Sequence, residues 1–528
     1  MFHRFYGGIR PADHKNTTRL LPIAAMKNPP AHVVLSLEGY GGALCAPIVA
    51  VGDRVARGQA VAQPENRGCP VYSSISGSVV AIEPRPNALG GKSLSIVVEN
   101  DGGLRVAPPL EMGDPEGQSP SQIVERLRLA AVAGLGGGGY PTWKKLEDAM
   151  GKVDTLLING AECEPYVTAD CRVMLESPQA VVDGSRILMK ALGLSHLTIA
   201  VEGDKTDGVS ALRRNLPMRG GDVSVKTLRV RYPQGSETQL VQRLTGRQVP
   251  PGERPTAVGC VVFNVATAAA VSRAVREGQP LLSRVVTVTG SAIEHPGNVE
   301  VPLGTPMELL AEEAGQLHGG PSRLLAGGPM MGKAQFDLAA PVTAGIHSLV
   351  FLRHRDYVAP PRREPVCIRC GKCVSACPMH LMPLSIHGDL QSGRLQALAK
   401  LHPQDCMYCG ACSYVCPAHI PLVNSIRQAQ ALLKGEPAAE VIAEPVAKSV
   451  EEPAAEVTAE PVVEPAAEVI AEPVAEVIAE PTAEPIAEPT PEPTSKPSAE
   501  KPQSDPPKPP QKKAEKKKGN TKKGGGKQ

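Results

Sequence analysis

The sequence predicts a multidomain protein of mixed α/β and β architecture that ends in a cysteine-rich module and a disordered tail. The chain has 528 residues, which suggests roughly three or four units because one hydrophobic core rarely serves so many residues. Its pattern changes from short β-rich runs to alternating strands and helices. Eight of its 13 cysteines fall in the single segment 367–416.

Composition excludes several classes of protein. A net charge of +2 argues against a general nucleic-acid binder, which normally carries a strongly basic domain. The opening MFHRFYGGIRPADHK lacks the apolar run of a secretory signal, so we expect a cytosolic chain. The charge-free stretch 255–272 contains a proline, a glycine and an asparagine and is interpreted as buried core rather than a membrane span.

The first unit is expected over residues 1–110 as a small all-β domain. Its runs HVVLSL, SGSVVAIE and KSLSIVVEN are separated by Gly, Pro and Asn. The phrases VGDRVARGQAVA and SSISGSVVAIE resemble the two halves of a lipoyl or biotinyl barrel-sandwich domain. A carrier domain needs an acceptor lysine, and no lysine lies between Lys27 and Lys92. We therefore expect the fold without the carrier function.

Two further units are expected before the cysteines. Over residues 121–275 a helical run, SQIVERLRLAAVA, leads into six residues from Gly134 to Gly139, then a helix starting near Pro141 and further strand–helix alternation. Over residues 284–350 strands are followed by a helix and Gly-rich turns. The Pro/Arg segment VAPPRREP is predicted to be a linker.

The C-terminal residues 436–528 repeat AEP and AEV units and close in KKAEKKKGNTKKGGGKQ. This composition buries too little apolar surface to offset its ordering entropy, so a disordered tail with polyproline II character is expected. The tail is interpreted as a solvated spacer. The alternative is that its terminal lysines touch anionic lipid or an acidic partner.

The cysteines lie within an expected module of residues 357–430 and fit the motif C-x2-C-x2-C-x3-C-P twice. Three closely spaced thiolates can bind three irons of a cubane, and in two-cluster ferredoxins the fourth cysteine of each run binds the other cluster. The rule predicts two [4Fe-4S] clusters that move single electrons. Their ligands would be Cys367, Cys370, Cys373 and Cys416 for cluster one, and Cys406, Cys409, Cys412 and Cys377 for cluster two.

A pair of zinc sites is the alternative, because zinc also binds four cysteines. Zinc sites more often separate two C-x2-C pairs than place three cysteines in a row. Of the remaining cysteines, Cys45, Cys69 and Cys260 are expected to be small buried residues. Cys163 and Cys171 flank a candidate site, so a role there is the alternative to a small buried residue for these two.

The second motif is GLGGGGYPTWKKL, residues 134–146. Glycines before a helix let backbone N–H groups approach a phosphate, and the helix N-terminus favours its negative charge. The spacing is not the usual G-x-G-x-x-G fingerprint, and a plain flexible turn is the alternative.

A family resemblance covers residues 1–425. GLGGGGYPTWKK, LINGAECEPYVTAD and RYPQGSETQLVQRLTGRQVPPGERPTAVGCVVFNVATAAAV resemble the FMN- and NADH-binding subunit of respiratory complex I, and still more the RnfC subunit of Rnf (Rsx) electron transport complexes. The order of units is similar to the latter. The resemblance implies a barrel-sandwich hybrid with GGIRPADHK at its start, a Rossmann-like FMN/NADH domain, a β-grasp domain and a two-cluster ferredoxin domain.

The resemblance also implies a flavin and nicotinamide site. Glycines would cradle the FMN phosphate with a lysine, Lys144 or Lys145, nearby, and polar residues would line the pocket. Ala161 and Phe263 depart from the complex I pattern, which has Asp and Asn there. For each polar residue the alternative is a helix cap or a satisfied turn. The implied residues are Gly134, Gly136, Gly137, Gly138, Gly139, Lys144, Asn159, Glu162, Glu164, Tyr232, Gly235, Glu237, Asn264 and Thr267.

The resemblance finally implies a function. A flavin accepts a hydride and releases electrons singly, so it can join NAD(H) to iron–sulfur clusters without an acid–base residue. Electrons would pass onward to a ferredoxin-like partner subunit, with the chain docked peripherally on the cytoplasmic side of the cell inner membrane. The alternatives are a cobalamin reductase of propanediol-utilising microcompartments and a wiring scaffold without nucleotide binding.

Overall fold

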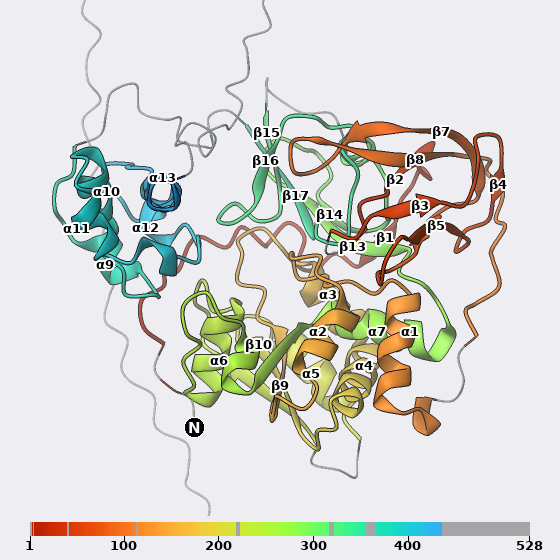
Figure 1. Ribbon diagram of the computed structural model, residues 1–528, viewed down its shortest axis with the longest axis horizontal. Helices are drawn as coiled ribbons and strands as arrows, with labels where there is room; N and C mark the ends of the chain where they lie inside the picture. Colours follow the sequence, from red (N-terminus) through yellow and green to blue (C-terminus); the bar gives the residue numbers. More distant parts are fainter. Residues whose placement is uncertain are drawn as a thin grey trace, which may run out of the picture. The chain divides into compact units, whose positions relative to one another are not determined.

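The computed structural model describes residues 3, 5–39, 42–111, 115–217, 222–315, 322–353, 356 and 366–435 (Figure 1). The tail expected over residues 436–528 and the linker expected over 358–365 lie outside the described residues. Across the described ranges, no helix has the length and apolar character needed to cross a membrane.

The N-terminal β domain, residues 31–110, pairs its strands in two antiparallel sheets with the orders β2-β8-β7-β4 and β3-β5-β6. Side chains of a strand point alternately to its two faces, and one set packs into the core between the sheets. Val33 of β2, Val61 of β5 and Ile96 of β8 belong to this core. The strands are β2 (His32–Ser36), β3 (Cys45–Pro47), β4 (Arg54–Val55), β5 (Ala60–Pro64), β6 (Val71–Tyr72), β7 (Gly77–Pro86) and β8 (Lys92–Asn100).

The α/β domain, residues 120–277, has a parallel sheet of strand order β11-β10-β9-β12. Its strands are β9 (Thr155–Gly160), β10 (Leu197–Glu202), β11 (Val223–Leu228) and β12 (Cys260–Asn264). Its helices are α1 (Pro120–Leu129), α2 (Thr142–Ala149), α3 (Ala169–Glu176), α4 (Pro178–Ala191), α5 (Thr206–Arg214), α6 (Glu237–Thr245) and α7 (Val265–Glu277), with 3-10 turns η1 (Pro115–Gly117) before it and η2 (Pro255–Val258) within it.

Both faces of this parallel sheet are covered. Leu156 and Ile158 of β9 pack into the large core that α1 to α5 and α7 share, whereas Leu157 packs with α6 on the other face. This alternation follows from the two-residue period of a strand. Burial on both sides explains the continuous apolar runs that predicted the strands.

Helix ends follow the local sequence. Ser119 and Gln122 form a capping box at the start of α1, and Pro120 occupies its first position. Asn264 caps α7 at its N-terminus, and Gly278, with φ of 64°, ends it. The α7 cap places the start of that helix beside the glycine-rich loop, where it becomes part of the site described below.

The mixed-sheet domain, residues 283–353, has a sheet of order β1-β14-β13-β17-β15-β16 and one helix, α8 (Met307–Glu313), in its core. Its first strand comes from the N-terminal segment, because β1 pairs in parallel with β14. The strands are β1 (Ile23–Ala25), β13 (Ser283–Thr289), β14 (Gly297–Pro302), β15 (Ser322–Ala326), β16 (Lys333–Gln335) and β17 (Ser348–Arg353).

The cysteine module, residues 366–435, consists of short helices whose backbone repeats the sequence duplication. Arg369 and Tyr408 both have φ of 55°, and each follows the first cysteine of its run by two positions. Gly371 and Gly410 repeat this match, with φ of 73° and 76°. The elements are α9 (Lys372–Ala376), α10 (Pro383–Gln391), α11 (Leu395–Ala399), η4 (Pro403–Asp405), α12 (Ala411–Tyr414) and α13 (Leu422–Lys434).

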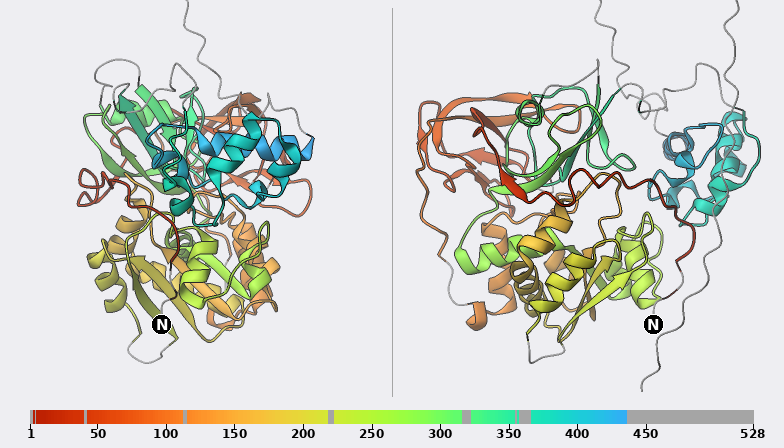
Figure 2. Two further views of the ribbon diagram at one scale, coloured as in Figure 1. Left: turned by 90° about the vertical axis from the view of Figure 1, so that its left-hand side faces the viewer. Right: turned by 180° about the vertical axis from the view of Figure 1, so that it is seen from behind.

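The N-terminal segment, residues 5–22, joins the domains (Figure 2). Gly8 N–H donates to the carbonyl of Ala376 in the cysteine module at 2.8 Å, and Ile9 forms a β-bridge with Tyr232 of the α/β domain. The segment then continues into β1 of the mixed-sheet domain. One stretch of chain therefore contacts three domains.

Gly184 should be intolerant of any side chain, because helices α4 and α7 pack closely there. A Cβ at Gly184 would lie 1.7 Å from the carbonyl oxygen of Ala268. We expect Gly184→Ala to destabilise the domain by about 3 kcal/mol through forced separation of the helices. Urea unfolding measures this. The matched control is Gly208→Ala in α5, where the nearest atom would be 3.6 Å away; an equal loss there would contradict the packing argument.

Candidate functional site

The glycine-rich loop has three consecutive backbone N–H groups, at residues 136–138, that donate to no acceptor among the described residues. Gly134 N–H donates to the carbonyl of Tyr140 and Gly139 N–H to that of Gly134, which closes the loop. Between them, residues 136–138 are exposed, and among the described residues their N–H groups donate to no acceptor. Successive free N–H groups form a concave site for an anion. The loop therefore fits a phosphate group.

Two polar residues at the start of α7, the N-cap Asn264 and Thr267 in the first turn, hold this loop in place. Thr267 Oγ1 accepts a hydrogen bond from Leu135 N–H at 2.8 Å. Asn264 Oδ1 caps the helix by accepting from Thr267 N–H at 3.3 Å, and its amide donates to Asp170 at 2.6 Å. A Cβ at Gly136 would lie 3.0 Å from the Asn264 Cβ, so close approach favours glycine there. Asn264 thus caps α7, and Thr267 fixes the loop. Both make local hydrogen bonds of the kind that was the alternative to a ligand contact.

Of the two lysines considered, Lys145 is the one in contact with other site residues. Its ammonium pairs with Glu237 at the start of α6 and lies 5.2 Å from the ring centroid of Phe263. Lys144 is solvent-exposed. Phe263, one of the departures from the complex I pattern, therefore provides an aromatic face for the lysine.

The end of β9 is tied to the segment before α6. Asn159 Nδ2 donates to the carbonyl of Gly235 at 2.7 Å, and Asn159 Oδ1 accepts from Ala161 N–H. Gly235 N–H in turn donates to Cys163 Sγ at 3.3 Å. Two of the site positions expected from the sequence resemblance, Asn159 and Gly235, thus contact each other directly.

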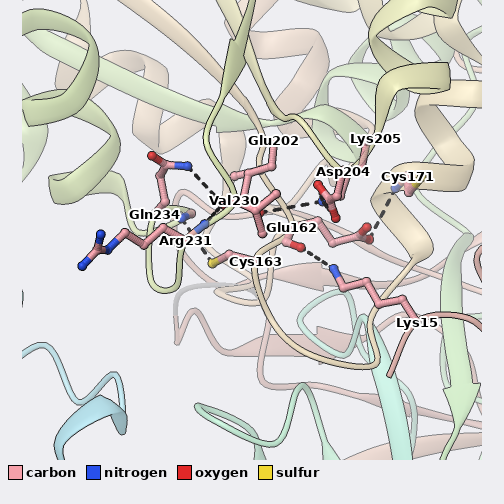
Figure 3. A network of polar contacts seen from close by, with 12 residues as sticks. Lys15, Glu162, Cys163, Cys171, Glu202, Asp204, Lys205, Val230, Arg231 and Gln234 are labelled. Carbon is pink, nitrogen blue, oxygen red and sulfur yellow. Dashed lines mark hydrogen bonds and ion pairs between the residues drawn. The ribbon is translucent and has the colours of Figure 1, made fainter. Parts of the chain in front are cut away.

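Glu162 sits in a buried charged network that sequence reasoning did not foresee (Figure 3). Its Oε1 accepts from the N–H groups of Asp170 and Cys171, at 2.7 and 3.4 Å, while its buried Oε2 has no hydrogen-bond partner among the residues that the structure describes. Burial raises the pKa of Glu162 to about 7. Lys15, which is 4% exposed, donates to the Glu162 carbonyl oxygen at 2.5 Å. The only sequence signal for Lys15 was that it ends the motif GGIRPADHK.

The other half of this network fixes the segment that carries Tyr232. Glu202, which is 1% exposed, accepts from Arg231 N–H and Gln234 Nε2, both at 3.0 Å (Figure 3). Lys205, which is 2% exposed, pairs with Asp204 at 2.9 Å. A buried carboxylate that lacks partners is costly, so the hydrogen bonds that Glu202 accepts fix residues 231–234 against the end of β10.

Glu164 and Tyr232 face the junction with the other domains. Glu164 accepts hydrogen bonds from Met330 N–H at 3.2 Å and Met331 N–H at 3.0 Å, both from the mixed-sheet domain. Tyr232 is 2% exposed and donates its hydroxyl to the carbonyl of Cys409 at 2.7 Å. An apolar cluster that includes Tyr232, Cys409 and Met330 fills the contact. The α/β domain and the cysteine module therefore meet at a motif cysteine.

The eight motif cysteines line two cavities, and the cavities divide them as the crossed rule predicts. Cys367 and Cys370 are exposed, whereas Cys409 and Cys412 are buried. The cysteines of the first cavity are Cys367, Cys370, Cys373 and Cys416, and those of the second are Cys377, Cys406, Cys409 and Cys412.

These cavities fit a cluster. Across the part of the chain that the structure describes, no group of three or more His, Cys, Asp or Glu side chains is arranged to hold a single metal ion. A cubane instead takes each thiolate at a different iron, which requires an open space between them. Backbone N–H groups of Arg369 and Tyr408 point at Cys367 Sγ and Cys406 Sγ, each at 3.4 Å, and such bonds tune cluster potentials.

Glu164 predicts a pH dependence of stability. Burial raises its pKa to about 7, above an ordinary carboxyl value, so the folded chain binds more protons than the unfolded chain and stability falls as pH rises from about 4.5 to 7. Glu164→Gln should lessen this fall by at least about 1 kcal/mol, equivalent to roughly one pKa unit. Urea unfolding at pH 5 and pH 7.5 measures it, with exposed Glu277→Gln as control. An unchanged pH slope would contradict the assignment.

Four family models match separate parts of the chain. They are the RnfC barrel sandwich hybrid domain at residues 3–103, the Nuo51 FMN-binding domain at 127–273, the SLBB domain at 285–334 and the 4Fe-4S dicluster domain at 366–420. The last range includes all eight motif cysteines. FMN and [4Fe-4S] clusters fit these matches as the cofactors. The matches also agree with a chain of mixed α/β and β structure that contains a barrel-sandwich hybrid, an FMN-binding domain, an SLBB domain and a 4Fe-4S dicluster domain.

Two curated relatives are similar over most of the chain. The C subunit of the Na⁺-translocating ferredoxin:NAD⁺ oxidoreductase complex of Acetobacterium woodii is 39% identical over 72% of this chain and 86% of its own length. The C subunit of an ion-translocating oxidoreductase complex of Pasteurella multocida is 40% identical over 81% of this chain, which spans about half, 51%, of that relative. A solved NAD⁺-reducing [NiFe]-hydrogenase matches 62% of this chain and 68% of its own with 17% identity and a TM-score of 0.44, too low to support an inference. This chain belongs to the RnfC family of ion-translocating oxidoreductase subunits.

Proposed function

We propose that this chain is the peripheral, NAD(H)-binding enzyme subunit of an ion-translocating oxidoreductase complex. It transfers electrons between NAD(H), FMN and two [4Fe-4S] clusters, to or from a ferredoxin-like partner. The family models for FMN binding and a 4Fe-4S dicluster support both cofactors. The names of the relatives support membership of a multisubunit complex.

The observation that carries this proposal is the buried contact between the two cofactor regions. Tyr232 lies between β11 and α6 of the α/β domain. Its hydroxyl donates a hydrogen bond to the carbonyl of Cys409, a motif cysteine of the second cavity. Electron transfer between a flavin and a cluster requires that their binding regions adjoin. A scaffold that only linked independent domains would not need this buried polar contact.

The residues of the chain would bind and orient the cofactors. FMN, when bound, exchanges a hydride with NAD(H) and single electrons with an iron–sulfur centre. The N–H groups of residues 136–138 would hold its phosphate, and Lys145 with Glu237 would border the same site. Asn159 and Glu164 would fix the loops around it. No acid–base side chain is assigned, because hydride transfer requires none.

The domain assignments follow from the same proposal. They are a barrel-sandwich unit over residues 1–110, a Rossmann-like FMN/NAD(H) domain over 121–275, a β-grasp domain over 284–350 and a ferredoxin domain over 357–430. The parallel sheet with helices on both faces supports the second of these. We place the subunit on the cytoplasmic side of the cell inner membrane, with ion translocation in its partner subunits.

NADH binding tests the enzyme against a wiring scaffold. Anaerobic addition of NADH to the FMN-loaded protein should bleach its iron–sulfur absorbance. Glu162→Ala should weaken NADH affinity by about tenfold, because it opens the buried network beside the site. Isothermal titration and absorbance spectra measure both effects, with exposed Glu277→Ala as control. A parent protein that binds neither FMN nor NADH would support the scaffold.

Cysteine variants test the crossed ligation. If Cys416 serves the first cavity, Cys416→Ala should lose one cluster of two, so that iron falls from about eight to about four atoms per chain. The electron paramagnetic resonance spectrum of the dithionite-reduced variant should match that of Cys370→Ala. A spectrum matching Cys409→Ala would instead show uncrossed ligation. Buried Cys260→Ala, outside both cavities, should retain the parent's iron and spectrum.

A further inference from the structure

A histidine from the mixed-sheet domain lies against the glycine-rich loop of the α/β domain. His347 comes directly before β17. A Cβ placed on Gly137 would be 3.4 Å from the His347 Cε1 and 3.5 Å from its Nδ1, so the Nδ1 edge of the imidazole faces the loop. This edge therefore lies beside the three N–H groups of residues 136–138 that have no acceptor in the described structure.

The nitrogen at that edge is also without a partner among the described residues. His347 Nδ1 is buried and makes no hydrogen bond there. Buried polar atoms in folded proteins are nearly always bonded to protein, water or a ligand, and each exception calls for an explanation. Two kinds of unused polar group, one from each domain, thus meet at one place.

A buried arginine keeps the two segments together. Arg284 is 4% exposed and donates to the carbonyl of Leu135 in the loop at 3.0 Å, and also to the carbonyl of Ala344 in the turn before His347. Gly345 packs on the same loop, because its Cβ would be 3.1 Å from the carbonyl oxygen of Gly137. The position of His347 is therefore fixed relative to the loop.

The charge state of His347 suits a hydrogen-bond donor. Burial, and then the nearby Arg284, lowers the pKa of its imidazole to about 4. At neutral pH the ring is neutral and carries one N–H, on either nitrogen. In the tautomer with hydrogen on Nδ1, it can donate to an anionic oxygen.

We propose that His347 is a flavin-site residue supplied by the mixed-sheet domain, and that its Nδ1–H donates to the FMN phosphate held by the N–H groups of residues 136–138. The assignment rests on the proposed function, because it requires that FMN bind at this loop. It makes the flavin site a joint product of two domains. None of the flavin-site residues that the sequence resemblance implied lies beyond residue 267.

Flavin titration of the full-length, flavin-free protein tests this assignment. Quenching of flavin fluorescence gives the affinity for FMN and for riboflavin, which lacks the phosphate. His347→Ala should bind FMN at least about tenfold more weakly than the parent, while its riboflavin affinity stays at the parent's value. His347→Gln, whose amide can still donate, should recover part of the loss. Exposed His196→Ala is the control and should bind both flavins as the parent does.

The outcomes separate the two proposals. A parent that fails to bind FMN overturns the proposed function itself. A parent that binds FMN, together with a folded His347→Ala variant of equal FMN affinity, overturns only the assignment of His347. Equal losses for FMN and riboflavin would also overturn it, because a phosphate contact cannot affect riboflavin. If the alanine variant does not fold, as judged by circular dichroism and iron content, His347→Leu, whose side chain fills similar space but cannot donate a hydrogen bond, decides by the same comparison.

Discussion

The hydrogen bond from Tyr232 to the carbonyl of Cys409 is the contact on which the arrangement of the chain depends. It is buried, so losing it would leave a hydroxyl and a carbonyl without partners. It also brings the loop that precedes α6 against a cysteine of the second cavity. Buried Glu202, which accepts a hydrogen bond from the backbone N–H of Arg231, stiffens the same loop. Rigidity here matters because the distance between two redox sites controls the rate at which electrons pass.

The parts predicted well from sequence are those that local chemistry determines. The cysteine runs were readable because ligand spacing is a property of one short segment, and the duplication reappears in the matched φ values of Arg369 and Tyr408. The strands of the parallel sheet were likewise local, since apolar runs act within a few residues. Family resemblance, and not local pattern, supplied the flavin-site residues.

The remaining contacts could not be predicted from sequence because they join residues far apart in the chain. Lys15 meets Glu162 across 147 positions, and nothing in either neighbourhood predicts the pairing. The ion pair of Lys145 with Glu237 likewise joins residues of different helices, which no local pattern around Lys144 and Lys145 indicates. His347, proposed above as a flavin-site residue, lies in the next domain, so no local pattern near the glycine-rich loop could indicate it. Asn264 and Thr267 were named from the resemblance, and their bonds to a helix start and to the glycine-rich loop became visible only in the structure.

The N-terminal segment has a consequence for how such a protein evolves. It bonds to Ala376, bridges to Tyr232 and ends as β1 beside β14. A stretch with contacts to three domains imposes a common selective constraint on all of them. Recombination that replaced a single domain with a homologue would present the old segment with new surfaces. The domains are therefore expected to be inherited as one cassette, and chimaeras should be built with this segment matched to every domain it contacts.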